Sequence, residues 1–254
     1  MNKWVIITGT SRGIGREMVN RILAEYPNYS IYAIQRNPTA EDLVLRDKFP
    51  NRIRFSYFDV KDFGKGKEFL SSLSSSKENP SILVNNAAIY TSGKFPIESS
   101  DEIFRVNYYA PKFLGEEFIR TTKDPIKIIN ISSGMGELRG FSKDSQLKLT
   151  NPDLKLHELD NQIELYLRNA SIGWPPDPYS ASKGALNTLT RIWTQILPER
   201  ITCISVCPGW VRTDMGGSTA PRSVREGGDT PIWAVITDEL RRGSFYRDRK
   251  IVPW

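Results

Sequence analysis

Trp4-Val5-Ile6-Ile7-Thr8-Gly9-Thr10-Ser11-Arg12-Gly13-Ile14-Gly15, near the start of the chain, decides the fold. Its first five residues form a short apolar run that is typical of a fully buried strand. Three glycines follow with the spacing Gly-x3-Gly-x-Gly, and an apolar helical pattern continues to about Tyr26. Strand, glycine-rich turn and helix in this order direct backbone N–H groups and a helix N-terminus at a pyrophosphate. The spacing departs from the Gly-x-Gly-x-x-Gly fingerprint, so the glycines of an ordinary turn remain an alternative at this point.

Strand-like and helical patterns alternate along the rest of the chain. We expect strands at 4–8, 30–35, 53–58, 81–85, 126–132, 201–206 and, more weakly, 244–247, and helices near 13–26, 40–48, 62–75, 98–120 and 178–197. Such alternation predicts an α/β fold, a single Rossmann-like doubly wound parallel sheet of about seven strands with helices on both faces. No linker, repeat or break in composition divides the chain, so we expect one dinucleotide-binding and catalytic domain over residues 1–254.

Composition narrows the class of protein. The 254 residues are 39% hydrophobic, enough for one α/β domain with a sizeable core. No apolar stretch reaches 18 residues and the run after Lys3 is too short for a signal peptide, so we expect no membrane partner and a cytoplasmic location. The formal net charge is +6, but the basic residues are scattered. Scattered basic residues are typical of a solvated surface, so we expect no nucleic-acid partner.

Cysteine and histidine usage gives no sign of a disulfide or a metal site. Cys203 and Cys207 fall in one expected strand, where residues four apart are too distant to be bridged. We expect them to be reduced core thiols, as in a cytosolic protein. His157 is the only histidine and has no cysteine or carboxylate cluster near it in the sequence, so we expect an ordinary surface residue and no metal.

The segment Tyr179-Ser180-Ala181-Ser182-Lys183 carries the main chemical signal. Residues four apart lie on one face of a helix, so the ammonium of Lys183 can favour the ionised form of the Tyr179 phenol. We therefore expect the pKa of the phenol, ordinarily about 10, to be lowered toward the working pH, where a general acid is most effective. A buried tyrosine beside a surface lysine is the alternative for this spacing taken alone.

The glycine turn and the Tyr-x3-Lys pair together make the chain similar to the short-chain dehydrogenase/reductase family. Further segments resemble the family's landmarks in the same order: Leu83-Val84-Asn85-Asn86-Ala87-Ala88, Phe104-Arg105-Val106-Asn107, Ile128-Ile129-Asn130-Ile131-Ser132-Ser133 and Cys207-Pro208-Gly209-Trp210-Val211-Arg212-Thr213-Asp214-Met215. Ala88 departs from the glycine that usually ends the first of them. The resemblance implies that Asn107, Ser133, Tyr179 and Lys183 are catalytic. It also implies that Ser133 hydrogen-bonds the substrate oxygen, that Lys183 holds the nicotinamide ribose and that Asn107 fixes a water.

The end of the second expected strand indicates which nicotinamide cofactor is bound. An acidic residue about twenty positions past the glycines would bind the ribose 2′-OH of NAD, but Gln35-Arg36-Asn37 stands there. Arg36 offers a planar guanidinium group suited to a 2′-phosphate. Arg12, in the glycine loop, resembles the second basic residue that NADPH-using members of the family carry there, so we expect NADPH/NADP. The resemblance extends the expected cofactor contacts to Gly9, Ser11, Arg12, Gly13, Ile14, Gly15, Arg36, Asp59, Val60, Asn86, Ala87, Tyr179, Lys183, Pro208, Gly209, Val211 and Thr213.

The region before Tyr179 makes the resemblance narrower. Ser133 and Tyr179 are 46 positions apart, farther than in most family members. With Gly173-Trp174-Pro175 and the final Trp254, this resembles the monomeric carbonyl-reductase branch, in which an inserted helix covers the surface that others use for tetramer formation. We therefore expect an insertion at about 137–175, a helix within it at 153–168, and a monomer. A disordered surface loop is the alternative to this helix.

The activity implied is NADPH-dependent reduction of a ketone or aldehyde carbonyl to an alcohol by hydride transfer, with Tyr179 as general acid. Tyr90, Met135 and Trp210, with Ser133, are expected to bind a small-molecule carbonyl substrate with a hydrophobic body. Residues 214–228, which hold four glycines and one proline, are expected to form a mobile lid or an ordinary flexible loop. The other hypotheses are a catalytically silent NADP(H)-binding redox sensor or regulatory protein of the same fold, and a nucleic-acid-binding protein.

Overall fold

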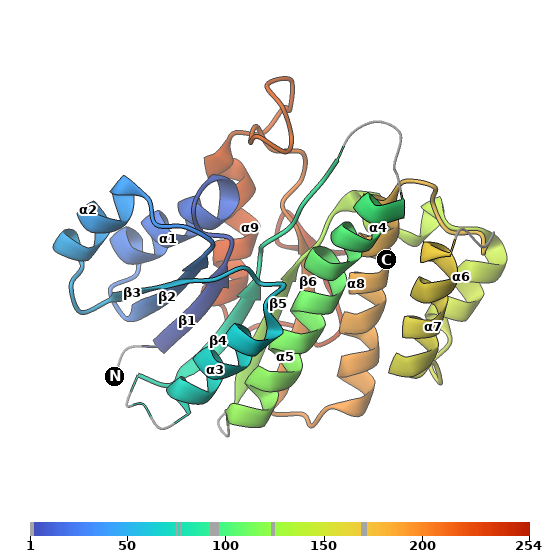
Figure 1. The fold of residues 1–254 in the computed structure, drawn as a ribbon, viewed down its shortest axis with the longest axis horizontal. Coiled ribbons are helices and arrows are strands. Elements are labelled where there is room, and N and C mark those ends of the chain that lie inside the picture. The colour runs from blue at the N-terminus through green and yellow to red at the C-terminus, as the bar shows by residue number, and fades with distance from the viewer. Residues whose placement is uncertain (1–2, 75, 77, 92–96, 123–124, 169–171) are drawn as a thin grey trace.

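A mostly parallel sheet runs through the molecule (Figure 1). The computed structural model describes the chain apart from residues 1–2, 75, 77, 92–96, 123–124 and 169–171. Over the described residues the sheet has eight strands in the order β3-β2-β1-β4-β5-β6-β7-β8. They are β1 Lys3–Thr8, β2 Tyr29–Gln35, β3 Ile53–Tyr57, β4 Pro80–Asn85, β5 Ile126–Ile131, β6 Ile201–Cys207, β7 Phe245–Arg247 and β8 Lys250–Val252. The predicted Rossmann-like α/β sheet is confirmed, and its order reverses between β1 and β4, the position where such sheets bind ligands.

The eighth strand was not predicted from the sequence. β8 pairs antiparallel to β7, and the other neighbouring strands pair in parallel. The turn between β7 and β8 is made by Asp248 and Arg249, which have φ values of 52° and 59°. Such turns are usually marked by glycine or asparagine, so neither this turn nor a strand of three residues gives a clear signal in the sequence.

Helices cover both faces of the sheet because alternate residues of each strand point to opposite sides. From β1, Val5 and Ile7 enter a core shared with α1 Gly13–Glu25, α2 Ala40–Lys48 and α9 Val224–Ile236. Trp4 and Ile6 enter the other core, shared with the helices of the second face. These are α3 Phe63–Leu73, α4 Ile97–Phe104, α5 Ala110–Thr121 and α8 Pro178–Ile196. The two cores make the protein a three-layer structure.

Two predicted helices and one predicted loop need correction. The helix expected over 98–120 is interrupted by a π-helical turn at Arg105–Tyr109 between α4 and α5. Residues 224–228 of the expected loop are instead the start of α9, where the Ser223 hydroxyl accepts a hydrogen bond from the Glu226 N–H and so caps the helix. The helix expected over 62–75 ends at Leu73, and residue 75 lies outside the described part of the chain.

The insertion before Tyr179 is helical. It contains α6 Lys143–Thr150, which was not predicted, and α7 Leu156–Leu167, which lies inside the helix predicted at 153–168. Short 3-10 turns at Gly134–Gly136 and Leu138–Gly140 lead into it. Figure 1 shows α6 and α7 beside α8, away from the β1 side of the sheet. The alternative of a disordered loop is therefore wrong for the described residues of this segment.

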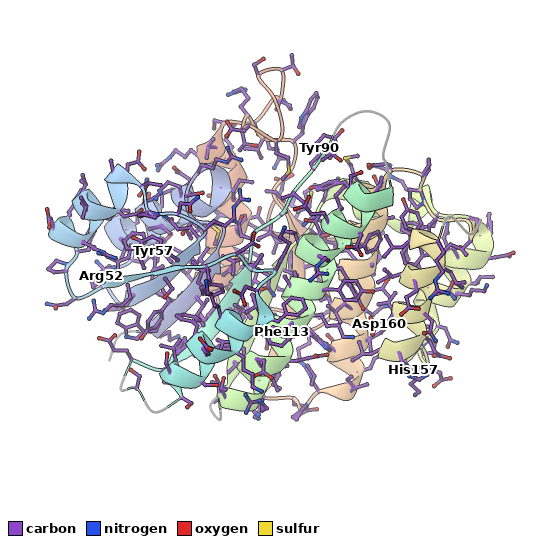
Figure 2. The ribbon with its side chains drawn as sticks, in the orientation of Figure 1. Arg52, Tyr57, Tyr90, Phe113, His157 and Asp160 are labelled. Atoms are coloured by element: carbon purple, nitrogen blue, oxygen red, sulfur yellow. The ribbon has the colours of Figure 1, made fainter. Side chains whose placement is uncertain are left out.

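α7 is fastened to the rest of the fold through Asp160, which Figure 2 labels. Its carboxylate accepts a hydrogen bond from the Tyr108 hydroxyl at 2.8 Å and pairs with the Lys112 ammonium at 2.5 Å. Leu159 and Ile163 on the same helix are fully buried in the core of that face. His157, one turn before, is exposed, as predicted.

Cys203 and Cys207 are both buried in β6 and are not bonded to each other. The prediction of free core thiols is confirmed. Within the described residues, no cluster of three or more histidine, cysteine, aspartate or glutamate side chains is arranged to hold a metal ion. The described helices also include none with the length and apolarity needed to span a membrane.

Candidate active site

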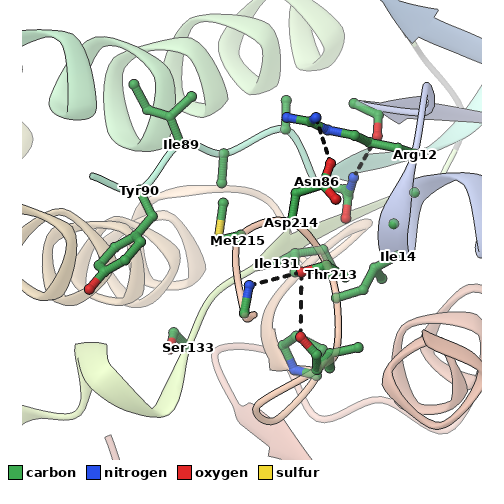
Figure 3. A pocket seen from close by; sticks show the side chains of 18 of the residues that line it. Arg12, Ile14, Asn86, Ile89, Tyr90, Ile131, Ser133, Thr213, Asp214 and Met215 are labelled. Atoms are coloured by element: carbon green, nitrogen blue, oxygen red, sulfur yellow. Dashed lines mark hydrogen bonds and ion pairs between the residues drawn. The ribbon is translucent and has the colours of Figure 1, made fainter. Parts of the chain in front are cut away.

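A cavity of about 1080 Å³ lies where the loops after the first six strands, β1 to β6, meet (Figure 3). These loops follow the carboxyl ends of parallel strands, so all of them meet at one edge of the sheet. With the exception of Asn107, every site residue predicted from the sequence lines the cavity. These residues are Gly9, Ser11, Arg12, Gly13, Ile14, Gly15, Arg36, Asp59, Val60, Asn86, Ala87, Tyr90, Ser133, Met135, Tyr179, Lys183, Pro208, Gly209, Trp210, Val211 and Thr213.

The turn between β1 and α1 is built so that backbone faces the cavity. Gly9 and Gly13 have φ values of 71° and 57°, a conformation that favours glycine. A Cβ at Gly15 would lie 2.2 Å from the Gly9 carbonyl oxygen, so the turn closes on itself without room for a side chain. α1 starts at Gly13 with no side-chain cap. Its first N–H groups are therefore free of a capping side chain and suit a phosphate.

The loop after β4 holds this turn in place. The Thr8 hydroxyl accepts hydrogen bonds from the N–H groups of Asn86 and Ala87, both at 3.0 Å. In return, Asn86 Nδ2 donates to the carbonyl oxygens of Thr8 and Gly9, at 2.8 and 3.2 Å. Two loops that are distant in the sequence thus form one rigid wall of the cavity.

A buried ion pair lies beneath the end of β2. Arg16 Nη2 is 2.7 Å from Asp42 Oδ1, and both side chains are almost fully buried. Gln35 Nε2 donates to Asp42 Oδ2 at 2.7 Å and to the Asn37 carbonyl at 2.9 Å. The residue that stands where NAD-binding relatives carry an acid is therefore turned inward, and Arg36 beside it is exposed at the cavity.

Arg16, Gln35 and Asp42 were missed by reasoning from the sequence. One signal was available, because Arg16 falls on the apolar face of α1 together with Val19 and Leu23. A charged residue on such a face is seldom buried without a partner. The partner, Asp42, could be recognised locally only as the N3 residue of the capping box that Thr39 forms at the start of α2.

Ser133, Tyr179 and Lys183 come together from β5 and α8. Ser133 follows β5, and its hydroxyl accepts a hydrogen bond from the Met135 N–H at 3.1 Å. Asp177 caps α8 by accepting hydrogen bonds from the N–H groups of Tyr179 and Ser180, at 3.2 and 3.0 Å. Tyr179 is therefore fixed in the first turn of α8, with Lys183 one turn later on the same face.

The predicted influence of Lys183 on the Tyr179 phenol is wrong for this structure. Burial raises the pKa of Tyr179 to about 12, and a side-chain hydrogen bond with Ser133 opposes this rise only in part. Burial also lowers the pKa of Lys183 to about 7. The amine donates to the Ile131 carbonyl at 2.8 Å and lies over the ring of the tyrosine. The amine therefore carries only part of a positive charge near neutral pH.

Asn107 lies behind the cavity instead of lining it. It is fully buried in the π-helical turn, where widened backbone geometry often marks a functional site. Its Oδ1 accepts from the Ile89 N–H at 2.9 Å, and its Nδ2 donates to the Ile89 carbonyl at 3.0 Å and to Ser182 Oγ at 3.1 Å. Ser182 Oγ in turn donates to the Tyr179 carbonyl at 2.8 Å. Asn107 thus joins the loop after β4 to the first turn of α8.

Apolar and aromatic side chains surround the mouth of the cavity beside Ser133 and Tyr179. Tyr90, Met135, Trp210 and Met215 are 39%, 50%, 57% and 40% exposed. The ring of Tyr90 meets the ring of Tyr179 edge-on, with centroids 5.3 Å apart. Met215 was not predicted to line the site, although it follows the Pro-Gly segment in the sequence. These four partly exposed side chains give the mouth of the cavity a hydrophobic surface.

Comparison with known proteins agrees with this geometry. A family model described as short chain dehydrogenase matches residues 3–144 and 169–223, which leaves out the segment that holds α7. "Carbonyl reductase [NADPH] 3" of Homo sapiens is 28% identical over 276 residues, covering 98% of this chain and 97% of the relative. "Carbonyl reductase [NADPH] 1" of Sus scrofa is 26% identical over 275 residues, covering 98% and 93%.

Solved structures share the fold. Salutaridine reductase from Papaver somniferum superposes with a TM-score of 0.84 at 22% identity, covering 96% of this chain and 99% of that one. The carbonyl reductase Sniffer of D. melanogaster superposes with a TM-score of 0.74 at 23% identity, and both chains are covered completely. At these identities the likeness establishes the architecture alone.

Proposed function

The chain belongs to the short-chain dehydrogenase family, and from that premise we propose that it catalyses the NADPH-dependent reduction of a ketone or aldehyde to an alcohol. The observation that carries the proposal is that Ser133, Tyr179 and Lys183 share one cavity with the glycine turn. Donors for a carbonyl oxygen and a cradle for a dinucleotide therefore lie at the same edge of the sheet. Relatives whose names include carbonyl reductase and NADPH support this choice within the family.

The residues of the cavity suit a phosphate-bearing dinucleotide. The uncapped start of α1 and the side-chain-free turn at Gly9, Gly13 and Gly15 would hold the pyrophosphate. Arg12 and Arg36 would bind the 2′-phosphate of NADPH, since the inward Gln35 offers no carboxylate for a free 2′-OH. NADPH, when bound, supplies the hydride that is added to the carbonyl carbon.

The side chains at the other end of the cavity would donate a proton to the substrate and stabilise the charge that develops on it. Negative charge that builds on the carbonyl oxygen is stabilised by donors aimed at it. We assign these donor roles to the hydroxyls of Ser133 and Tyr179. Because burial raises the pKa of Tyr179 to about 12, the phenol keeps its proton at neutral pH and is ready to give it to that oxygen. Lys183 and Asn107 would hold α8 and its first turn against β5 and the loop after β4.

The mouth of the cavity favours a substrate with a hydrophobic body. Tyr90, Met135, Trp210 and Met215 present aromatic and thioether surface next to the hydroxyl pair. Methionine side chains adapt their shape to irregular ligands. We therefore propose a small aromatic or aliphatic ketone or aldehyde as the substrate class.

We also propose that the protein is a monomer. The inserted helix α7 packs on the outer side of the α4 and α8 layer through Leu159 and Ile163. It is fastened there by the ion pair of Asp160 with Lys112. This part of the helical surface is therefore covered by the chain's own insertion and not presented to a second copy. Light scattering of the purified protein at several concentrations tests this.

A panel of ketones and aldehydes, followed by the loss of NADPH absorbance and repeated with NADH, tests the proposed function. We expect oxidation of NADPH with hydrophobic carbonyls and much slower oxidation of NADH. NADPH binding without oxidation across the panel would contradict the proposal. That result would instead favour the catalytically silent NADP(H)-binding sensor. Absence of NADPH binding would exclude both.

A further inference from the structure

Arg12 and Arg36 both line the cavity, but they differ in what they contact. Arg12 Nη1 lies 2.6 Å from Asp214 Oδ2, an ion pair that Figure 3 shows between the glycine turn and the loop after β6. The two side chains are 72% and 70% exposed. Across the described residues, the Arg36 side chain has neither an ion-pair nor a hydrogen-bond partner. The guanidinium of Arg36 is thus open to a ligand, whereas that of Arg12 is already paired with Asp214.

The carboxylate of Asp214 is presented by a well-ordered turn. The Gly217 N–H donates to the Thr213 carbonyl at 2.8 Å, and the Gly216 N–H donates to Thr213 Oγ1 at 3.1 Å. The Trp210 ring N–H closes the turn by donating to the Gly216 carbonyl at 2.8 Å. Because Thr213 on one side of the aspartate and Gly216 on the other are held in this way, the position of Asp214 opposite the glycine turn is a property of the fold.

Hydrogen bonds also tie the glycine turn to the end of β2. Thr10 Oγ1 donates to Gln35 Oε1 at 2.9 Å, and the Gly9 N–H donates to the Ile34 carbonyl at 2.8 Å. Arg12 lies two residues after Thr10, and Arg36 directly follows Gln35. The two arginines therefore lie next to the contact between the glycine turn and the end of β2, where a single phosphate could bind both.

We infer that Asp214 is a specificity-determining residue that occupies Arg12 until a 2′-phosphate displaces it. The inference rests on the proposed function, in which NADPH is the cofactor. A phosphate bound by two guanidinium groups is a stronger partner than one exposed carboxylate. NADH lacks that phosphate and leaves the ion pair in place. Asp214 thus weakens the binding of NADPH, and of the NADP that must later leave, without changing that of NADH.

Asp214→Asn tests this inference, because asparagine keeps the size of the side chain and removes its charge. The dissociation constant for NADPH, measured by tryptophan fluorescence, is expected to fall by about twofold to fivefold, the range that an exposed ion pair is worth. The constant for NADH is expected to stay unchanged, and the gain for NADPH should shrink at high salt. In an Arg12→Ala background the same substitution should have no effect on NADPH binding.

Asp248→Asn is the matched control. Asp248 pairs with Arg222 at 2.7 Å, so this variant removes the same charge from an ion pair that anchors the same loop. This variant should not change the dissociation constant for NADPH relative to that for NADH. Unchanged or weaker NADPH binding by Asp214→Asn overturns the inference, as does an equal change for both cofactors. If the unmodified protein binds NADH as tightly as NADPH, the cofactor assignment itself fails. This failure can be told apart from a failure of the Asp214 inference, because it is seen in the unmodified protein without any variant.

Discussion

The Nζ atom of Lys183 lies over the face of Tyr179, 5.7 Å from the centroid of the ring. Two ionisable groups are thus packed together in a buried site, and burial shifts their pKa values in the directions that keep both neutral. The tyrosine pKa rises to about 12 and the lysine pKa falls to about 7. The lysine therefore changes its charge state close to neutral pH, whereas the tyrosine keeps its proton there.

This lysine makes the free energy of unfolding depend on pH. Its pKa is about 7 in the folded chain and returns to 10.5 on unfolding. Between these values the unfolded chain binds a proton that the folded chain does not, so stability rises with pH. We expect a slope of up to about 1.4 kcal/mol per pH unit from this group.

Urea unfolding without cofactor, from about pH 7 to about pH 9, measures that slope. Lys183→Met should flatten it. Lys127, whose pKa burial lowers to about 8, contributes in the same direction in both proteins, so the difference between them isolates Lys183. Equal slopes for the two proteins would contradict the expectation.

Tyr179→Phe removes the hydroxyl proposed to protonate the substrate. Loss of a general acid commonly costs about 10²–10⁴ in rate, so kcat should fall by at least that range. NADPH should still bind, because the ring is retained. Tyr109→Phe is the control, since this partly buried hydroxyl has no place in the cavity. Near-normal turnover of the Tyr179 variant would refute its assigned role.

Asn107→Asp tests whether the π-helical turn positions the site. A carboxylate cannot donate to the Ile89 carbonyl, and the buried position would hold an unpaired charge. We expect a loss of about 1–3 kcal/mol in the free energy of unfolding, together with a lower kcat. Asn151→Asp is the control, because within the described part of the chain that exposed amide acts through its oxygen alone, accepting from the Asp153 N–H. A variant as stable and active as the parent would show that Asn107 has no positioning role.

Gly15→Ala tests the close packing of the glycine turn. The new Cβ would lie 2.2 Å from the Gly9 carbonyl oxygen, so the turn must shift. Overpacking of this kind costs about 1–3 kcal/mol, and we expect NADPH binding to weaken with it, as measured by denaturant unfolding and fluorescence titration. Gly64→Ala should be neutral or stabilising, because a Cβ there lies no closer than 3.4 Å to a neighbour. Equal behaviour of the two variants would contradict this account.

The sequence predicted most of the sheet and the residues of the cavity because both depend on local patterns. Apolar runs such as Val5 to Ile7 and the spacing of Gly9, Gly13 and Gly15 are visible in a single segment. The parts that could not be predicted depend on residues far apart in the chain. The Arg16–Asp42 pair joins two helices, and the shifted pKa values of Tyr179 and Lys183 follow from burial by several loops. Spacing placed Lys183 and Tyr179 on one face of the helix, but the burial that sets their pKa values is not visible in the spacing.

Asp160→Asn tests how the insertion is fastened. The substitution removes the charge that pairs with the partly buried Lys112 and weakens the bond from the Tyr108 hydroxyl. We expect a loss of about 1–3 kcal/mol in the free energy of unfolding and faster proteolysis within α7. Glu164→Gln, on the same helix, breaks an exposed pair with Arg168 and should cost less than about 0.5 kcal/mol. If both variants are equally stable and resist protease equally, then Leu159 and Ile163 hold α7 without help from the ion pair. If the Asp160 variant also associates in light scattering while the Glu164 variant does not, the covered face is what keeps the protein a monomer.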